Sequence, residues 1–405
     1  MRYGPRHVMS AGVIGAMLLV GACGAPSTDS SQEEPTGAVP DVPSEPVTLN
    51  ILDVAGNLQL TQGMIDSFVE ENPDVVSDVT FETSPSPEMA GKVKAQQDAG
   101  RVNIDLVLTG NDGLAAGVEQ DLFIELLPEF ADRLTGMDNY LEPAAAMQEL
   151  AQGYGVVVTY YPSGPLIEYD PARVPDPPTS AEELLEYARQ NPGTVQYARP
   201  ANSGPGRTLL MGLPYILGDS DPKDPVNGWD KTWAYLAELD QYVEYYPTGT
   251  TATMTNLANG SAQIIASTTG WDINPRALGT VPAGFEVGTL DGFTWVTDSH
   301  YAVIPKGVSE DKQSAVIALI EWMLTPEQQA KAYDAGYFYP GPAIEGVTVD
   351  MAPEESQQVI EEFGREEYAA LIEDNPKVTP LDAAALVTAF DTWDREIGGD
   401  KVLEE

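Results

Sequence analysis

Short apolar runs alternate with amphipathic stretches from residue 47 onward. Runs rich in β-branched residues and bounded by turn residues predict strands at 47–54, 79–83 and 104–108. Between the first two, apolar residues recur three and four positions apart, which predicts a helix that ends at Asn72-Pro73. Strand and helix therefore alternate, and this order predicts a parallel sheet with helices on both faces.

A second alternating unit follows the proline-rich stretch 171–178. Further strands are predicted at 154–161, 195–198, 262–267, 285–290 and 301–304, and late helices at 309–324, 353–363, 365–374 and 381–397. About 360 residues remain after the N-terminal region, more than one hydrophobic core usually organises. The pattern therefore predicts two α/β lobes.

The first 23 residues differ from the rest of the chain. Arg2 and Arg6 precede an uncharged apolar run, 11–22, and Cys23 is the only cysteine. These features are typical of a secretory signal, and the run is too short to span a bilayer. Its end resembles a bacterial lipobox, so we expect a lipoprotein signal peptide at 1–22 and a lipid anchor on Cys23 at the extracellular face of the cell membrane. Residues 23–46 lack periodicity and predict a disordered tether.

Composition narrows the possible partners. The chain has 63 Asp and Glu against 20 Lys and Arg, a formal net charge of −43. Such a field repels nucleic acid and anionic lipid headgroups, so neither is expected as a partner. It is compatible with a cationic ligand and also with a solvated acidic surface suited to an exported protein.

Polar residues follow the predicted strands of the first lobe. In a parallel sheet, ligands bind outside the carboxyl ends of the strands, so the loops at Ala55, Ser84 and Thr109 are expected to share one edge. The candidate ligand-binding residues there are Asn57, Ser84, Asn111 and Asp112.

A late segment carries a family resemblance. Residues 302–306, AVIPK, are followed by a helix and then by 324–329, LTPEQQ. Together with the lipobox, spacer and two lobes, they resemble the extracellular solute-binding lipoproteins of ABC importers, family 1 type. The branch that handles polyamines, thiamine, iron(III) and phosphonates is the most similar, and 191–200 resembles its thiamine-like members.

The resemblance implies a two-lobed periplasmic-binding-protein-like fold of type II. Each lobe would be a mainly parallel sheet flanked by helices, with the ligand cleft at the hinge. The implied lobes are 47–162 with 298–345 and 163–297 with 346–405. The implied partners are a small-molecule solute and ABC permease subunits, and the protein would be a monomer without a cofactor.

Aromatic and acidic residues occur together at two places, and a further aromatic candidate lies at the first crossing. In polyamine binders of this family a Trp followed two positions later by Asp contacts the ligand, but here Trp295 and Asp298 are three apart, which points them to opposite faces of a strand unless the chain bends at Thr297. Trp271 with Asp272, and Tyr160 at the first crossing, are further candidates. An aromatic face beside a carboxylate suits an organic cation, whereas each residue alone is as well explained by packing.

Residues 202–207, NSGPGR, favour an anion instead. Backbone amides at a helix start, together with Ser203 and Arg207, can form an anion-binding site. An ordinary loop with a surface Arg explains the same segment equally well. If both the cation-binding and the anion-binding site exist, the ligand carries a positive and a negative charge. Residues 337–340, YFYP, either line the cleft or pack against the last helices, and packing is favoured.

Catalysis and metal binding find little support. Asp298, Ser299 and His300 are neighbours in a strand and cannot form a relay, and no G-x-S-x-G elbow is present. We therefore expect no catalytic and no metal-binding residues, and a small cationic or zwitterionic solute of the polyamine, thiamine or aminophosphonate class. An iron(III) site of tyrosines, a sugar-binding member, a secreted hydrolase using a carboxylate pair and a passive scaffold remain alternatives.

Overall fold

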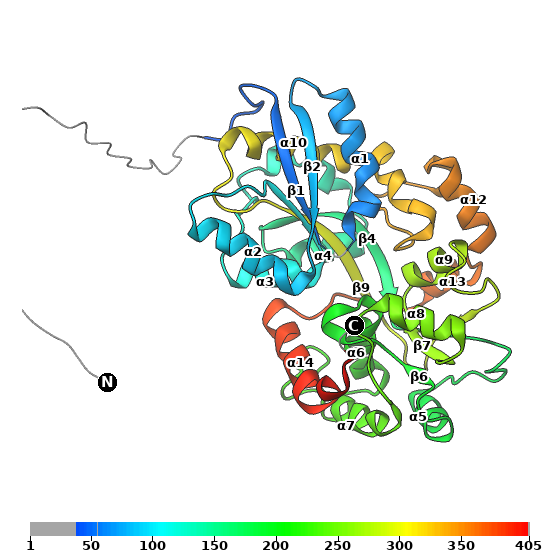
Figure 1. Cartoon of the computed structure of the whole chain (residues 1–405). Coiled ribbons are helices and arrows are strands. Elements are labelled where there is room, and N and C mark those ends of the chain that lie inside the picture. Colours follow the sequence, from blue (N-terminus) through cyan, green and yellow to red (C-terminus); the bar gives the residue numbers. More distant parts are fainter. Residues whose placement is uncertain (1–37, 55, 404–405) are drawn as a thin grey trace, which may run out of the picture. The chain divides into compact units, whose positions relative to one another are not determined.

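The computed structural model describes residues 38–54 and 56–403, and its strands form two sheets (Figure 1). The first sheet has the order β10-β9-β3-β1-β2, and β4 also pairs with β9. Its strands are β1 (Val47–Asp53), β2 (Val76–Thr83), β3 (Leu106–Thr109), β4 (Gly155–Gly164), β9 (Trp295–Val303) and β10 (Lys377–Val378). The second sheet has the order β6-β7-β5-β8, from β5 (Leu166–Tyr169), β6 (Val195–Gln196), β7 (Ile264–Ser267) and β8 (Glu286–Gly288).

Both sheets are mixed. β1 pairs in parallel with β2 and β3, as predicted, but β9 is antiparallel to β3 and β4. In the second sheet only β6 and β7 are parallel, so the expectation of a mainly parallel sheet does not hold there. The reason is the order of the strands along the chain. β5 follows β4 and is the first strand of the second sheet, whereas β8 is its last strand and precedes β9. The strand that enters the sheet and the strand that leaves it run in opposite directions.

Helices cover the first sheet with an apolar core. Met64 and Phe68 of α1, Ile317 and Ile320 of α10, and Ile51 of β1 belong to one buried cluster. These side chains recur at helical spacing, so burial of one stripe per helix explains the packing. The helices of this region are α1 (Asn57–Glu71), α2 (Ser86–Asp98), α3 (Asn111–Glu119), α4 (Glu142–Leu150), α10 (Glu310–Met323) and α11 (Pro326–Gln329).

The second sheet has its own core, built around aromatic side chains. Trp229, Trp393 and Tyr246 are almost completely buried in it, and Trp393 Nε1 donates to Tyr197 Oη at 3.0 Å. The helices that contribute to this core are α5 (Ala181–Gln190), α6 (Gly204–Ile216), α7 (Asp230–Leu239) and α14 (Ala383–Glu396). A smaller cluster joins α8 (Thr250–Asn259) to β7, and another, which contains Leu166 of β5 and Trp295 of β9, includes side chains of α9 (Thr269–Ala277), α12 (Glu354–Phe363) and α13 (Glu367–Asp374). The predicted start of α5 is confirmed, because Ser180 Oγ accepts from Glu183 N.

The crossing between the sheets lies where the sequence predicted it. β4 ends at Gly164 and β5 begins at Leu166, with one residue between them. β9 runs beside β4 over most of its length (Figure 1), with Tyr161 opposite Asp298. The lobe boundaries inferred above stay a prediction, and the C-terminal region touches both sheets, since β10 pairs with β9 whereas α14 belongs to the second core.

Part of the predicted tether contacts the folded chain. Arg133 Nη1 donates to Pro40 O at 3.0 Å, and Ser44 N donates to Asp311 Oδ1 at 3.1 Å. Charged side chains thus hold a segment whose own composition predicts no structure, so residues 38–46 lie against the protein instead of extending from it. The predicted signal peptide and Cys23 lie outside the described residues. Among the described helices, none has the length and apolar character needed to cross a membrane.

Candidate functional site

A cavity of about 660 Å³ lies where loops from both sheets meet. Segments after β2, β3, β6 and β7 line it, together with the middle of β9 and residues 337 and 338. The segments after β2, β3, β6 and β7 follow the carboxyl ends of strands, where the alternation of strand and helix predicted a ligand site.

Several helices begin at the cavity. The first residues of α2, α3, α6 and α8 line it, and Trp271 in the first turn of α9 does so too. The start of α8 follows Gly249, which makes no side-chain cap, and a Cβ placed on Gly249 would meet nothing within 4 Å. Helix starts carry unsatisfied N–H groups and partial positive charge, so this wall favours negative groups of a ligand.

A buried ion pair forms the floor. Arg207 of α6 is 8% exposed, and its Nη2 donates to Asp298 Oδ2 of β9 at 2.7 Å. Asp298 also accepts from Tyr161 Oη at 2.9 Å, from Ser299 N at 3.0 Å and from Asn111 Nδ2. Burial opposes the charge of Arg207, but Asp298 and then Asp112 outweigh it and raise its pKa above the usual value. Arg207 therefore stays charged.

Unpaired polar atoms surround this ion pair. Asp112 Oδ1 lies 3.7 Å from Arg207 Nη1, too far for a hydrogen bond. Asp112 Oδ1, Arg207 Nε and Ser86 Oγ have no hydrogen-bond partner among the described residues. Buried polar atoms without partners are costly, so an occupant that satisfies such groups would be stabilised here.

Aromatic side chains form the apolar wall. Tyr161 stacks on Phe338 with ring centroids 4.7 Å apart, and Trp271 meets Tyr337 edge to face at 5.8 Å. The expectation that 337–340 pack against the last helices is wrong for Tyr337 and Phe338, which line the cavity. A turn with positive φ at Gly336 and Phe338 directs them there, whereas Tyr339 does reach Tyr368 of α13.

His300 lies next to the ion pair in the same strand. It lines the cavity with Asp298, two positions away, and shares a 3.0 Å hydrogen bond between its Nδ1 and Thr159 Oγ1. Burial lowers the pKa of His300 to about 4, so the ring is neutral at pH 7. Ser299 lies between them in the strand and does not line the cavity, in keeping with strand alternation.

Five of the eleven residues proposed from the sequence line the cavity: Asp112, Ser203, Arg207, Trp271 and Asp298. Ser203 also caps α6, because its Oγ accepts from Gly206 N, and it is hydrogen-bonded to Thr250 Oγ1 at 2.8 Å. Thus the NSGPGR segment is a helix start at the cavity, with Arg207 buried instead of on the surface.

Six others lie outside the lining. Asn57 is buried at the start of α1, where its Oδ1 accepts a hydrogen bond from Thr61 Oγ1. Ser84 does not line the cavity, whereas the next two residues, Pro85 and Ser86, do. Tyr160 packs into the first core while its neighbour Tyr161 faces the cavity. Asn111 does not line the cavity, but its Nδ2 donates a hydrogen bond to Asp298, which does. The two remaining residues are Trp295 and Asp272.

Trp295 packs away from the cavity at the start of β9. It is fully buried, its ring meets Phe293 at 4.7 Å, and its Nε1 donates to Leu371 O at 3.0 Å. Asp298 lines the cavity and Trp295 does not, although the pairing of β4 with β9 is irregular beside Thr297. The aromatic and acid pair of the polyamine binders is therefore not formed here.

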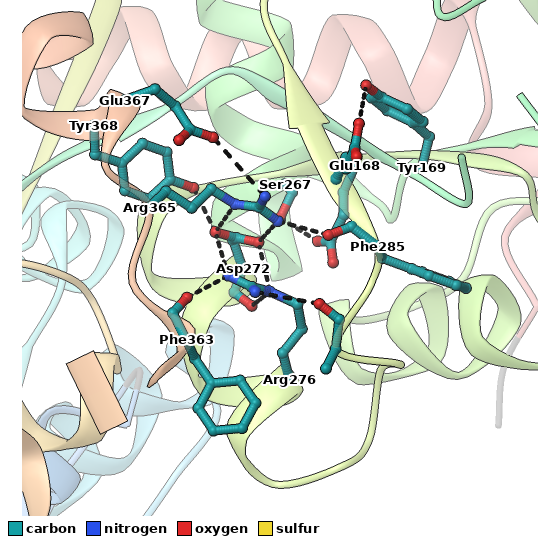
Figure 2. Close-up of polar contacts among 12 residues, drawn as sticks. Glu168, Tyr169, Ser267, Asp272, Arg276, Phe285, Phe363, Arg365, Glu367 and Tyr368 are labelled. Carbon is teal, nitrogen blue, oxygen red and sulfur yellow. Dashed lines mark hydrogen bonds and ion pairs between the residues drawn. The ribbon is translucent and has the colours of Figure 1, made fainter. Parts of the chain in front are cut away.

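Asp272 is the centre of a second buried cluster, shown in Figure 2. Arg276 and Arg365 each donate two hydrogen bonds to its carboxylate, at 2.6 to 3.2 Å, and Tyr368 Oη donates to Oδ2 at 2.7 Å. Arg276 also donates to Phe363 O at 2.6 Å. The cluster thus joins α9 to the segment before α13, and Asp272 has no exposure to a ligand.

Glu168 of β5 adjoins this cluster. Its Oε2 accepts from Ser267 Oγ at 2.8 Å. Burial, and then the charge of Asp272, raise the pKa of Glu168 to about 8, against the opposing effects of Ser267, Arg365 and Arg276. At neutral pH the carboxyl is therefore mostly protonated.

Comparison with known proteins identifies the family. Residues 63–358 match the family model for bacterial extracellular solute-binding proteins. The chain belongs to this family. A search of the curated proteins found no significant match.

Solved structures agree on the fold of this solute-binding protein. A putative spermidine/putrescine ABC transporter protein from Listeria monocytogenes is 16% identical, with a TM-score of 0.57 over 85% of this chain and 99% of that one. A periplasmic thiamin binding protein is 15% identical, with a TM-score of 0.60 over 89% and 100%. AfuA from Actinobacillus pleuropneumoniae, with bound fructose-6-phosphate, is 15% identical, with a TM-score of 0.58 over 86% and 98%. At these identities they show the two-lobed periplasmic-binding-protein fold, and their ligands differ.

Sequence reasoning missed several lining residues, among them Tyr161, His300 and Phe338. His300 was within reach, since it shares a strand face with Asp298 by alternation. The position of Tyr161 at the cavity depends on which strand lies beside β9, and that of Phe338 depends on how residues 336–341 turn. Neither of these features can be read from a local sequence pattern.

Proposed function

We propose that this protein captures a small charged organic solute in the cavity and delivers it to the permease of an ABC importer. The observation that carries the proposal is one cavity in which helix starts, an aromatic wall and unpaired charged atoms meet. Aromatic surface beside placed polar groups is typical of small-molecule sites. The proposal assigns no chemical step to the protein, in keeping with its family.

The chemistry of the lining favours a cationic nitrogen on the solute. Asp112 offers a buried oxygen without a partner, and Glu88 adds an exposed carboxylate at the lining. The rings of Trp271, Tyr161 and Tyr337 add the quadrupole attraction that organic cations experience. A polyamine is less favoured than a thiamine or aminophosphonate type of solute, because Trp295 lies outside the cavity.

Thermal unfolding with candidate solutes tests this proposal. The panel consists of spermidine, thiamine, thiamine monophosphate, 2-aminoethylphosphonate, iron(III) and glucose. A solute at 100 times its dissociation constant should stabilise the protein by about 2.7 kcal/mol. Loss of this stabilisation in Asp112→Asn, with the exposed Asp98→Asn as control, would assign the cavity. No stabilisation by any small solute would favour a passive scaffold instead.

We also propose that Cys23 anchors the protein by a lipid on the extracellular side. The lipobox-like 20–23 segment supports this. Labelled palmitate should enter the wild-type protein in a bacterial host and should not enter Cys23→Ser. Equal labelling of the two would contradict the anchor.

A further inference from the structure

The cavity holds two opposite charges whose hydrogen-bonding capacity is not used up. Arg207 Nη1 and Asp112 Oδ1 form an ion pair at 3.7 Å, which is too long for a hydrogen bond. Among residues 38–54 and 56–403, Asp112 Oδ1 and Arg207 Nε have no hydrogen-bond partner, and the guanidinium donates to Asp298 through Nη2. Each belongs to a side chain that is largely buried, with 9% and 14% exposure. A ligand in the cavity can therefore form hydrogen bonds with both the donor and the acceptor.

Asp298 is saturated by the protein. An ionised carboxylate has about four acceptor sites. In Asp298 one oxygen receives Asn111 Nδ2 and Ser299 N, and the other receives Tyr161 Oη and Arg207 Nη2. Little capacity remains for a solute ammonium, so Asp298 acts on Arg207 by fixing its guanidinium.

The wall beside Arg207 is also suited to an anion. Arg207 is the fourth residue of α6, and Ser203 at the start of that helix is hydrogen-bonded to Thr250 at the start of α8. The two helix starts therefore adjoin, and residues 250–252 of α8 line the cavity without a side-chain cap. Arg199 also lines the cavity, but its guanidinium is paired with Asp394 through two nitrogens.

We propose that the solute carries an oxyanion, a phosphate, phosphonate or carboxylate, which binds Arg207 Nη1 and the start of α8. Its cationic nitrogen faces Asp112, so one zwitterionic solute supplies the hydrogen-bond partners that both side chains lack. Asp298 is a positioning residue that does not contact the solute. This inference rests on the proposed function and adds the second charge to the solute.

Paired probes that differ by one oxyanion test the inference. Thiamine monophosphate is compared with thiamine, and 2-aminoethylphosphonate with ethanolamine, by calorimetric titration. In at least one pair, the phosphorylated or phosphonylated member should bind wild-type protein at least tenfold more tightly. Arg207→Gln should abolish that preference, Arg207→Lys should retain part of it, and the exposed Arg395→Gln should leave it unchanged.

Inorganic phosphate tests the subsite without a known solute. At constant ionic strength set with NaCl, phosphate should raise the melting temperature of wild-type protein and of Arg395→Gln. It should have no effect on Arg207→Gln. No effect of phosphate on the wild type, or an equal effect on all variants, would overturn the inference.

Asp298→Asn separates positioning from contact. If Asp298 only orients Arg207, the variant should lose affinity for the oxyanion member of a pair and keep its affinity for the partner that lacks the oxyanion. Equal losses for both members would instead place Asp298 on the cationic nitrogen and overturn its assigned role. A solute that binds equally well to wild type and Arg207→Gln would refute the anion subsite while the proposed function stands. If no small solute of any charge binds, both fail.

Discussion

Two buried clusters of Arg and Asp lie in this protein, and they differ in how completely their atoms are paired. Around Asp272, two guanidinium groups and one phenol satisfy both carboxylate oxygens, and the cluster is closed to a ligand (Figure 2). Around Arg207, Asp298 is saturated, but Asp112 Oδ1 and Arg207 Nε have no hydrogen-bond partner among the described residues, and both side chains line the cavity. Residue type alone does not separate structure from function here, whereas unused hydrogen-bonding capacity does.

The largest effect is expected at Asp272. In Asp272→Ala, two buried guanidinium groups lose their carboxylate, and breaking a buried pair in this way costs about 3–5 kcal/mol. Urea unfolding followed by circular dichroism should show this loss. Asp98→Asn, which removes an exposed pair with Lys94, should lose less than about 1 kcal/mol. Comparable losses would mean that the Asp272 cluster is not sealed.

Glu168 gives the same cluster a pH dependence. Its pKa is raised to about 8 in the folded protein, above the value of about 4.3 for an unfolded Glu. The folded state therefore binds more protons than the unfolded state between these values, so stability falls as pH rises through this window, by at most about 1.4 kcal/mol per unit. Melting temperatures between pH 5 and 8 should fall less steeply in Glu168→Gln. The exposed Glu286→Gln on β8 should retain the wild-type slope, and an unchanged slope in Glu168→Gln would refute the assignment.

A smaller cost is expected at the cavity. Asp298→Asn keeps a polar partner for Tyr161 and leaves Arg207 near Asp112 and the cavity, so we expect a loss of about 1–3 kcal/mol, below that of Asp272→Ala. Parallel urea titrations of the two variants measure the difference directly. Equal or reversed costs would break the contrast between an open and a closed cluster.

The smallest effect concerns Trp295. Trp295→Phe removes the hydrogen bond to Leu371 O, worth about 1 kcal/mol, and some packing. Solute affinity should stay within a factor of two of wild type, because the ring lies outside the cavity. Trp271→Phe is the matched substitution inside the lining and should weaken binding. A large loss of affinity in Trp295→Phe would place that ring against the solute after all.

Much of the fold followed from local patterns in the sequence. Most strands and the α5 cap were predicted correctly, because period and turn chemistry act over a few residues, whereas β5 and the first part of β9 were not predicted. The antiparallel strands of the second sheet were not predicted, because their direction depends on where the chain enters and leaves that sheet.

By itself, the sequence predicted that Trp295 and Asp298 point to opposite faces unless the chain bends at Thr297, and that a helix begins near Ser203, since alternation and capping are local properties. Only the tertiary structure decided that Tyr161 lies at the cavity in place of Tyr160, and that Asp272 is sealed while Asp112 is left unpaired. Burial and the supply of hydrogen-bond partners come from segments far apart in the chain, such as Arg365 for Asp272 and Arg207 for Asp298.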